Sequence, residues 1–188
     1  PDRPVLVTVS RLAVEKNIAF LLRVVQRLTG EFPDLLFVVA GEGPDESRLK
    51  RMTHELGLDA NVRFFGNLDR RTTLLDAYRA GDAFVFASPT ETQGLVLIEA
   101  MALGVPIVST AVMGTAMVLE GARSALIAEE DVDDFAAKAA GVLRSGDLRA
   151  SLGAAGPEDA RRSSSVTLVQ RVEQLYAGLR GRSELAPA

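Results

Sequence analysis

Short runs of β-branched and aromatic residues alternate with helix-like patterns along most of this chain. The run Val5–Val9 precedes an amphipathic pattern over Asn17–Leu28, and the run Leu35–Ala40 precedes a charged helical pattern over Glu46–Leu56. Strands separated by helices in this way are typical of βαβ units, which build a parallel sheet with helices on both faces. The sequence therefore predicts an α/β fold, a Rossmann-like, doubly wound parallel sheet of about six strands.

Further along the chain the same alternation continues and then becomes wholly helical. The remaining strands are predicted at Val62–Phe65, Ala83–Ala87, Val105–Ser109 and Ala125–Ala128, and helices at Arg71–Ala80, Leu95–Leu103 and Val132–Leu143. Two more helical patterns, Leu148–Ala154 and Val166–Arg180, follow. Gly153, Gly156, Pro157 and the serine run Ser163–Ser165 are expected to separate these last two helices.

The composition excludes several classes of function. The 188 residues are 47% hydrophobic and 24% charged, which is enough to build one sizeable core. A net charge of −4 and only 5% aromatic residues predict no nucleic-acid partner. There is no cysteine and a single histidine, His54, so thiol chemistry, sulfur-ligated zinc and a Ser-His-Asp triad are disfavoured. With no long apolar run and no leader pattern, a cytoplasmic protein is expected.

In open α/β sheets, ligands bind at the carboxyl ends of the strands, over the N-termini of the following helices. After the first predicted strand, Arg11 and Lys16 flank the start of a helix, where the helix dipole disfavours cations. An anion held between them would resolve this conflict, and arginine can bind a phosphate through two hydrogen bonds. Two solvated surface cations are the alternative that the spacing leaves open.

The turn GEGP at Gly41–Pro44 follows the second predicted strand. It does not match the dinucleotide-binding pattern G-x-G-x-x-G, because Glu46 stands at the third glycine position and the pattern belongs after the first strand. Gly41 and Gly43 are instead expected to let the backbone turn and approach a ligand closely.

The stretch TETQGLVLIEA places two acids, Glu91 and Glu99, around an apolar helix. Because Leu95–Leu103 is apolar almost all the way round, we expect this helix to be buried on every side. A buried carboxylate at Glu99 needs hydrogen-bond donors, and ribose hydroxyls are suitable ones. Gly94 would let the backbone N–H groups at the helix start face a ligand.

The polar residues before this helix also have a purely structural explanation. Thr90 with Gln93 three residues later fits a capping box, which would account for the polar residues up to Gln93, Glu91 among them. It would not account for Glu99.

Other charged groups are expected to be structural. The stretch DVDDF at Asp131–Phe135 looks like a D-x-D metal pair, but acids in the first turn of a helix are favoured by its dipole anyway. His54, Arg70 and Arg71 are expected on solvated faces. We therefore expect no metal ion and no cofactor.

Several motifs together resemble one enzyme family. The stretch Glu91–Pro106 resembles the E-x7-E signature of the family 4 retaining glycosyltransferases of GT-B fold. VSRLAVEKN at Val9–Asn17 is similar to the Arg/Lys diphosphate loop of that family, and AGEGP at Ala40–Pro44 to its second glycine-rich turn. VRFFGNL at Val62–Leu68 resembles the strand and loop under the nucleotide base.

The resemblance runs in register from about Val5 to Leu143 and implies the C-terminal, donor-binding half of a GT-B enzyme. Residues 1–160 would then be a nucleotide-sugar-binding domain, and residues 161–188 a C-terminal helix with a frayed tail. The abrupt start of the chain would reflect an acceptor-binding N-terminal domain of the same parent chain. Such enzymes transfer a sugar from a nucleotide donor with retention and usually need no metal.

Carried over residue by residue, the resemblance implies catalytic roles for Arg11, Lys16 and Glu91. Arg11 and Lys16 would bind the donor diphosphate and stabilise the charge that develops on the leaving phosphate. Glu91 would face the donor sugar, and Glu99 would bind the ribose hydroxyls. Further donor contacts are implied for Gly41, Gly43, Phe65, Gly66, Asn67, Leu68, Gly94, Leu95 and Val96.

A few positions depart from the family pattern. Ser10 stands where glycine is usual, and Gln93 replaces a common phenylalanine. VMGTAM at Val112–Met117 lacks the usual G-G-x-x-E, which leaves the donor contacts of that loop open.

Two other functions remain as alternatives at this point, a GT-B nucleotide-sugar epimerase and a non-catalytic nucleotide-binding module. The Arg/Lys loop together with E-x7-E favours the transferase. The expected partners are a nucleoside diphosphate sugar and the N-terminal domain of the parent chain. A lipid acceptor and a peripheral contact with the inner face of the membrane stay open.

Overall fold

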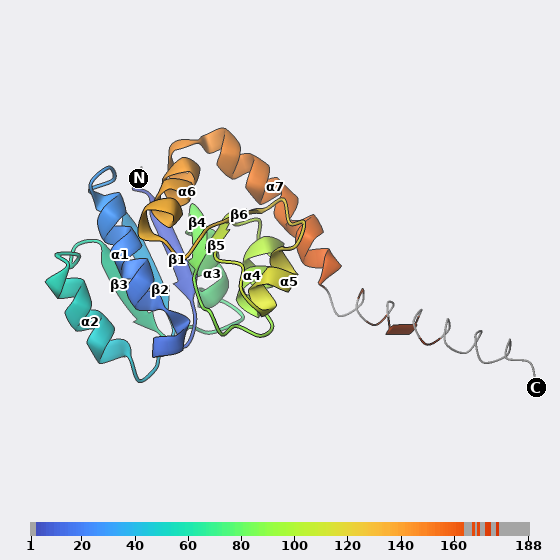
Figure 1. Ribbon diagram of the computed structural model, residues 1–188, viewed down its shortest axis with the longest axis horizontal. Helices are drawn as coiled ribbons and strands as arrows, with labels where there is room; N and C mark the ends of the chain where they lie inside the picture. The colour runs from blue at the N-terminus through green and yellow to red at the C-terminus, as the bar shows by residue number, and fades with distance from the viewer. Residues whose placement is uncertain (1–2, 164–166, 168, 170–171, 174–175, 177–188) are drawn as a thin grey trace, which may run out of the picture.

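A six-stranded sheet, in which every neighbouring pair of strands is parallel, lies at the centre of the computed structural model (Figure 1). The structure describes residues 3–163 and, beyond them, residues 167, 169, 172, 173 and 176, so most of the predicted C-terminal helix and tail lies outside the described residues. The strands are β1 Val5–Val9, β2 Leu36–Ala40, β3 Val62–Gly66, β4 Ala83–Phe86, β5 Ile107–Ser109 and β6 Ala125–Ile127. The predicted Rossmann-like α/β fold is confirmed.

The strand order is β3-β2-β1-β4-β5-β6. The chain therefore builds one half of the sheet outward from β1 and then returns to build the other half from β4. In the register, Val7 of β1 is paired with Val38 of β2 on one side and with Phe84 of β4 on the other. Connections that leave β1 and β4 in opposite directions open a crevice at the carboxyl ends of these two strands. This switch point positions the candidate site.

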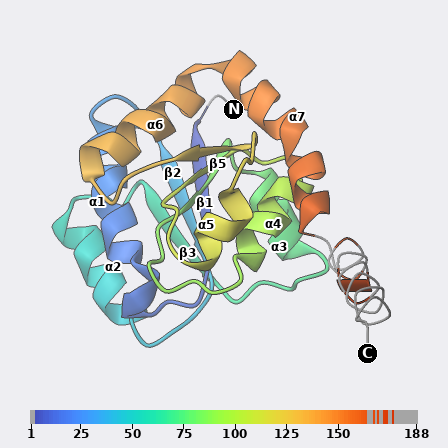
Figure 2. The ribbon, with the colours of Figure 1, turned by 45° about the vertical axis from the view of Figure 1, so that its right-hand side comes forward.

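Helices cover both faces of the sheet (Figures 1 and 2). α1, α2 and α6 pack on one face, α3 and α4 pack on the other, and α7 follows α6 and packs along α4. Among the described residues, none of the helices is both long and apolar enough to span a bilayer. The helices are η1 Val14–Lys16, α1 Ile18–Thr29, α2 Glu46–Glu55, α3 Thr73–Arg79, α4 Leu95–Ala102, α5 Gly114–Leu119, α6 Val132–Arg144 and α7 Gly146–Arg162.

The strands are apolar at nearly every position because both of their faces are covered. Leu6 of β1 and Val85 of β4 pack into the core under α1 and α6, whereas Val7 and Phe84 pack into the core under α3 and α4. All four side chains are at most 1% exposed. Continuous apolar runs of this kind distinguish buried parallel strands from half-exposed antiparallel ones.

The break expected at Gly153, Gly156 and Pro157 is wrong, because α7 runs through all three residues. A Cβ on Gly156 would lie 2.4 Å from the carbonyl oxygen of Met101, and one on Gly153 would lie 2.6 Å from that of Gly104. The glycines are therefore positions where the backbone of α7 approaches that of α4 and its C-terminal turn. This packing outweighs the low helix propensity of glycine.

The expectation that the apolar helix α4 is buried on every side is also wrong. Leu97, Ala100 and Met101 are fully buried against the sheet and α7, but Leu95 is 53% exposed. The first turn of α4 therefore emerges from the core at the crevice.

The stretch Val112–Met117, described above as a loop, contains the start of α5. A Cβ on Gly114 would lie 2.2 Å from the backbone of Thr92, and the Gly114 N–H donates to the carbonyl oxygen of Glu91 at 2.8 Å. α5 is thus fixed to the segment that precedes α4.

Candidate functional site

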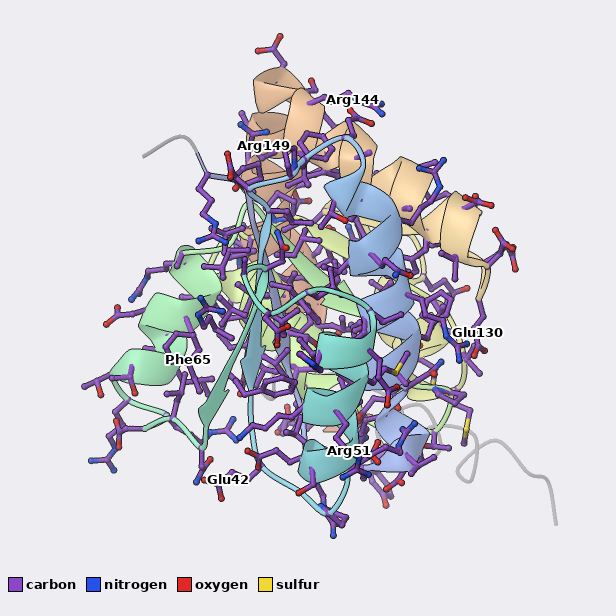
Figure 3. All side chains as sticks on the ribbon, turned by 90° about the vertical axis from the view of Figure 1, so that its left-hand side faces the viewer. Glu42, Arg51, Phe65, Glu130, Arg144 and Arg149 are labelled. Atoms are coloured by element: carbon purple, nitrogen blue, oxygen red, sulfur yellow. The ribbon has the colours of Figure 1, made fainter. Side chains whose placement is uncertain are left out.

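A cavity of about 480 Å³ opens at the carboxyl ends of β1, β2 and β3. The loops after these strands line it, together with one residue each from α3 and α4. Figure 3 shows Glu42, a lining residue, at the end of the sheet toward which the strand arrows point, with Arg144 and Arg149 at the opposite end. The lining residues are Val9, Ser10, Arg11, Ala40, Gly41, Glu42, Asn67, Leu68, Arg70, Leu74 and Val96.

Two glycines bring the loops after β1 and β2 together beside this cavity. A Cβ on Gly41 would lie 1.9 Å from the carbonyl oxygen of Ser10, and one on Gly43 would lie 2.1 Å from that of Leu12. The Leu12 N–H in turn donates to the carbonyl oxygen of Glu42 at 2.9 Å. Both glycines are therefore needed for the contact between the two loops, and Gly41 also lines the cavity. The contact fixes the conformation of the β1–α1 loop.

Lys16 and Glu91 form an ion pair across the switch point, one from the loop after β1 and the other from the loop after β4. Lys16 Nζ lies 2.9 Å from Glu91 Oε2, and the two side chains are only 19% and 18% exposed. Glu91 Oε1 accepts the N–H groups of Gln93 and Gly94, both at 3.1 Å. Burial alone would raise the pKa of Glu91, but the hydrogen bonds from Lys16, Gly94 and Gln93 outweigh it and lower that pKa. Glu91 is therefore held as a carboxylate.

The capping box expected from Thr90 and Gln93 does not form. α4 begins at Leu95, its N-cap is Gly94 in the left-handed region with φ 65°, and no side chain caps it. In the part of the chain that the structure describes, the N–H groups of Leu95 and Val96 have no hydrogen-bond acceptor. The start of α4 thus offers free donors at the positive end of the helix dipole.

Arg11 differs from Lys16 in having no ion-pair partner among the described residues. Its side chain is exposed, lines the cavity, and makes no ion pair within residues 3–163. The two predicted cations therefore lie on the same loop, and of the two only Lys16 is paired with an acid within residues 3–163.

Asn17 fixes this loop where η1 ends and α1 begins. It adopts the left-handed conformation with φ 56°, which is uncommon for a residue other than glycine. Its Nδ2 donates to the carbonyl oxygen of Ala87, just after β4, at 3.3 Å, and to Glu130 Oε1 at 2.8 Å. Asn17 therefore ties the loops after β1, β4 and β6 together next to Lys16.

Glu99 is held by two side chains, so it is not the unpartnered acid that the sequence suggests. The hydroxyl of Tyr78 donates to Glu99 Oε2 at 2.9 Å, and Arg70 forms an ion pair with Oε1. The side chain of Glu99 is 27% exposed, whereas Tyr78 is fully buried. Burial, the negative charge of Glu99 and the hydrogen bond to it all raise the pKa of Tyr78, which keeps the phenol protonated as a donor.

The predicted base loop reaches the cavity in part. Asn67 and Leu68 line it, and the Asn67 N–H donates to Glu42 Oε1 at 3.2 Å. Gly66 lies beside the Glu42 side chain, in the left-handed region with φ 64°. The side chain of Phe65 is 55% exposed and does not line the cavity.

Sequence reasoning missed Arg70, Tyr78 and Glu42. The side chain of Arg70 is 73% exposed, as expected for a solvated face, but it also lines the cavity and forms an ion pair with Glu99. Its place in the loop that follows the third strand is a usable signal, by the same rule that selects Arg11. Tyr78 lies within α3 and has no local signal, since only the fold brings it to Glu99.

The acidic stretch at the start of α6 acts as a helix cap. Asp131 Oδ1 accepts the N–H of Asp134 at 2.9 Å, and Asp134 forms an ion pair with Lys138. Within the described residues, the structure contains no group of three or more metal-ligating side chains.

Comparison with known families agrees with this architecture. A family model described as glycosyl transferases group 1 matches residues 1–159. The chain belongs to the group 1 glycosyl transferases, as the motifs predicted.

Relatives within the family are longer proteins. D-inositol 3-phosphate glycosyltransferase 2 of Catenulispora acidiphila is 38% identical over 173 residues, which cover 86% of this chain and 40% of the relative. Sulfoquinovosyl transferase SQD2 of Arabidopsis thaliana is 31% identical over 185 residues, covering 95% of this chain and 34% of the relative. Phosphatidyl-myo-inositol mannosyltransferase of Mycolicibacterium smegmatis is 31% identical over 170 residues, covering 88% and 42%. The chain therefore spans less than half the length of these relatives.

Solved structures share the fold. HepE from Anabaena, in complex with UDP, superposes with a TM-score of 0.81 at 20% identity over 94% of this chain and 49% of that chain. A variant of S. aureus TarM in complex with Fondaparinux, alpha-GlcNAc-glycerol and UDP has a TM-score of 0.80 at 23% identity, covering 93% and 36%.

Proposed function

We propose that this chain is the donor-binding half of a retaining glycosyltransferase and binds a nucleoside diphosphate sugar in the crevice between β1 and β4. The observation that carries the proposal is the Lys16–Glu91 pair at the switch point, next to the open N-terminus of α4. Membership of the group 1 family supports it, as do the related folds of HepE and TarM, whose structures contain UDP.

In this proposal the diphosphate lies between the β1–α1 loop and the start of α4. Arg11 supplies a guanidinium without a competing acid, and Leu95 and Val96 supply free N–H groups. Guanidinium groups and helix N-termini both favour phosphate. Lys16 would exchange part of its contact with Glu91 for a phosphate oxygen and stabilise the negative charge that develops as the sugar–phosphate bond breaks.

Glu91 would then face the donor sugar. As a carboxylate with a lowered pKa it acts only as an acceptor, so it can receive hydrogen bonds from sugar hydroxyls. Transfer with retention requires the acceptor to attack from the face that the leaving phosphate occupies. The phosphate-binding cations and the acceptor would therefore lie on the same side of the sugar.

The nucleoside would extend along the cavity toward β3. Glu99 would receive the ribose hydroxyls, and Asn67 and Leu68 would line the base. No metal ion takes part in this arrangement, since Arg11, Lys16 and the N–H groups supply the positive charge.

We further propose that the acceptor is bound by a second domain of the parent protein, because the chain spans only 40% of its Catenulispora relative. The name of the Mycolicibacterium relative, a phosphatidyl-myo-inositol mannosyltransferase, supports a lipid acceptor as the first class to assay.

Isothermal titration calorimetry with UDP, GDP and ADP, without added metal, tests the donor site. We expect Arg11→Ala to weaken binding of the preferred nucleotide by about 2 kcal/mol, the scale of a hydrogen bond to a charged group. Arg23→Ala is the matched control, because Arg23 is also exposed but lies on α1 outside the cavity lining. Equal losses in the two variants, or no binding by the unmodified chain, would refute the proposed site.

A further inference from the structure

The two carboxylate oxygens of Glu99 have different partners, one buried and one exposed. Oε2 accepts the hydroxyl of Tyr78 at 2.9 Å, and that side chain is fully buried on α3. Oε1 is paired with Arg70, whose side chain is 73% exposed. One partner belongs to the core, and the other belongs to the surface.

The position of the Tyr78 hydroxyl is fixed by aromatic packing. Its ring lies 5.3 Å from that of Phe84, and Phe84 stacks on Phe86 at 6.2 Å, both within β4. Side chains packed in this way are held in one rotamer. Among the described residues, Glu99 is the one hydrogen-bond partner of this buried phenol. Tyr78 therefore holds Glu99 in a constant orientation relative to β4.

Arg70 contacts Glu99 and also lines the cavity. It lines the cavity with Leu74 and Val96, whereas Glu99, one turn after Val96 on α4, is not a lining residue. An exposed ion pair of this kind contributes little stability and exchanges readily. A ligand that brings hydroxyl donors to Glu99 Oε1 competes with Arg70 for that oxygen.

We propose that Tyr78 is a positioning residue for Glu99. Arg70 is an exchangeable ion-pair partner of the same carboxylate, and the hydroxyl groups of the bound ligand displace it. The inference rests on the proposed nucleotide binding, in which those hydroxyls belong to the ribose. Because Tyr78 occupies Oε2, Oε1 is the oxygen that receives the ligand hydroxyls, and Arg70 competes with the ligand for this oxygen. Binding of the ribose is strengthened by the first residue and weakened by the second.

A ratio of two dissociation constants tests this division of roles. The constant for a 2′,3′-dideoxynucleoside diphosphate is divided by that for the ribonucleoside diphosphate with the same base, UDP, GDP or ADP, whichever the unmodified chain prefers. Since both ligands carry the same base and phosphates, the ratio isolates the ribose hydroxyls from any general damage to the fold. For the unmodified chain we expect a ratio of about ten or more, the effect of losing hydrogen bonds to a charged group.

The variants are expected to move this ratio in opposite directions. Tyr78→Phe keeps the ring packing and should bring the ratio close to one, as should Glu99→Gln. Arg70→Gln should raise the ratio by about two- to fivefold, the scale of a surface ion pair. Because Arg70 is exposed, this variant is expected to fold even if Tyr78→Phe does not.

The outcomes separate this inference from the proposed function. If the unmodified chain binds no nucleotide, both are refuted. If it binds with a ratio near one, nucleotide binding stands and the role of Glu99, Tyr78 and Arg70 is overturned. A folded Tyr78→Phe variant with an unchanged ratio, or an unchanged or lower ratio in Arg70→Gln, would also overturn it.

Discussion

At the scale of single residues, Glu91 serves the helix and the site at once. α4 begins without a side-chain cap, and Glu91 fixes the turn that leads into the helix by accepting the N–H groups of Gln93 and of the N-cap residue Gly94. The same carboxylate neutralises Lys16, which would otherwise be a poorly placed cation near a helix start. The acid thus lies at the crevice in a fixed orientation, which suits a role toward a ligand.

The lowered pKa of Glu91 predicts a pH-dependent contribution to stability. Because the pKa in the folded state lies below the ordinary value of 4.5, the contribution is complete above pH 4.5 and is lost as the pH falls through the lowered pKa. We expect Glu91→Gln to lower the free energy of unfolding at pH 7 by about 1 kcal/mol, a modest value because the pair keeps some contact with solvent. Urea unfolding of both proteins should show this difference shrinking in the acidic range, and a difference that is constant with pH would contradict the ion pair.

Asn17 allows a second prediction at this scale. Its left-handed backbone would strain alanine but not glycine. We expect Asn17→Ala to lower the free energy of unfolding by about 1–2 kcal/mol, and Asn17→Gly to lower it by less. Thermal unfolding of the two variants measures this, and equal destabilisation would show that the side-chain bonds to Ala87 and Glu130 matter more than the backbone conformation.

At the scale of elements, the contact between α4 and α7 gives the first turn of α4 a rigid support. Gly156 sits on the backbone of Met101, which is itself fully buried. α4 is therefore clamped between the sheet and α7, while its N-terminal turn stays open to the crevice.

Two helical glycines allow a matched test of this packing. A Cβ on Gly156 would lie 2.4 Å from the Met101 carbonyl oxygen, whereas one on Gly141 in α6 would meet nothing within 4 Å. We expect Gly156→Ala to lower the free energy of unfolding by about 1–3 kcal/mol. Gly141→Ala should raise it by about 0.5–1 kcal/mol, because alanine favours the helix. If both variants are stabilised, α7 does not pack on α4 as closely as described.

The elements also show how far the sequence predicts this structure. β1 has the predicted bounds, Val5–Val9, because a strand buried on both faces produces an unbroken apolar run that can be read locally. The course of α7 through Gly156 was not predictable in this way, since the reason for that glycine lies on another helix. The same holds for Glu99, whose partner Tyr78 is 21 positions away in the chain.

At the scale of the whole molecule, the strand order brings together segments that are far apart in sequence. Lys16 and Glu91, 75 positions apart, meet because β1 and β4 are neighbours in the sheet. The candidate donor site is thus built wholly from the part of the chain described here, at one edge of the sheet. The chain spans 40% of the length of its Catenulispora relative.

This arrangement predicts that binding and transfer can be separated. We expect the 188-residue chain to bind its preferred nucleoside diphosphate in the presence of EDTA but to transfer no sugar, because transfer needs an acceptor held in line with the donor and water excluded from the crevice. Ligand at about 100 times the dissociation constant should stabilise the fold by about 2.7 kcal/mol, which is measurable as a rise in melting temperature. Arg11→Ala should reduce that rise at the same ligand concentration, whereas Arg23→Ala should not. Sugar transfer by this chain alone would show that the acceptor site is already present in it. Binding that required magnesium would contradict a metal-free site and would favour a metal-binding role for the acids around Asp131.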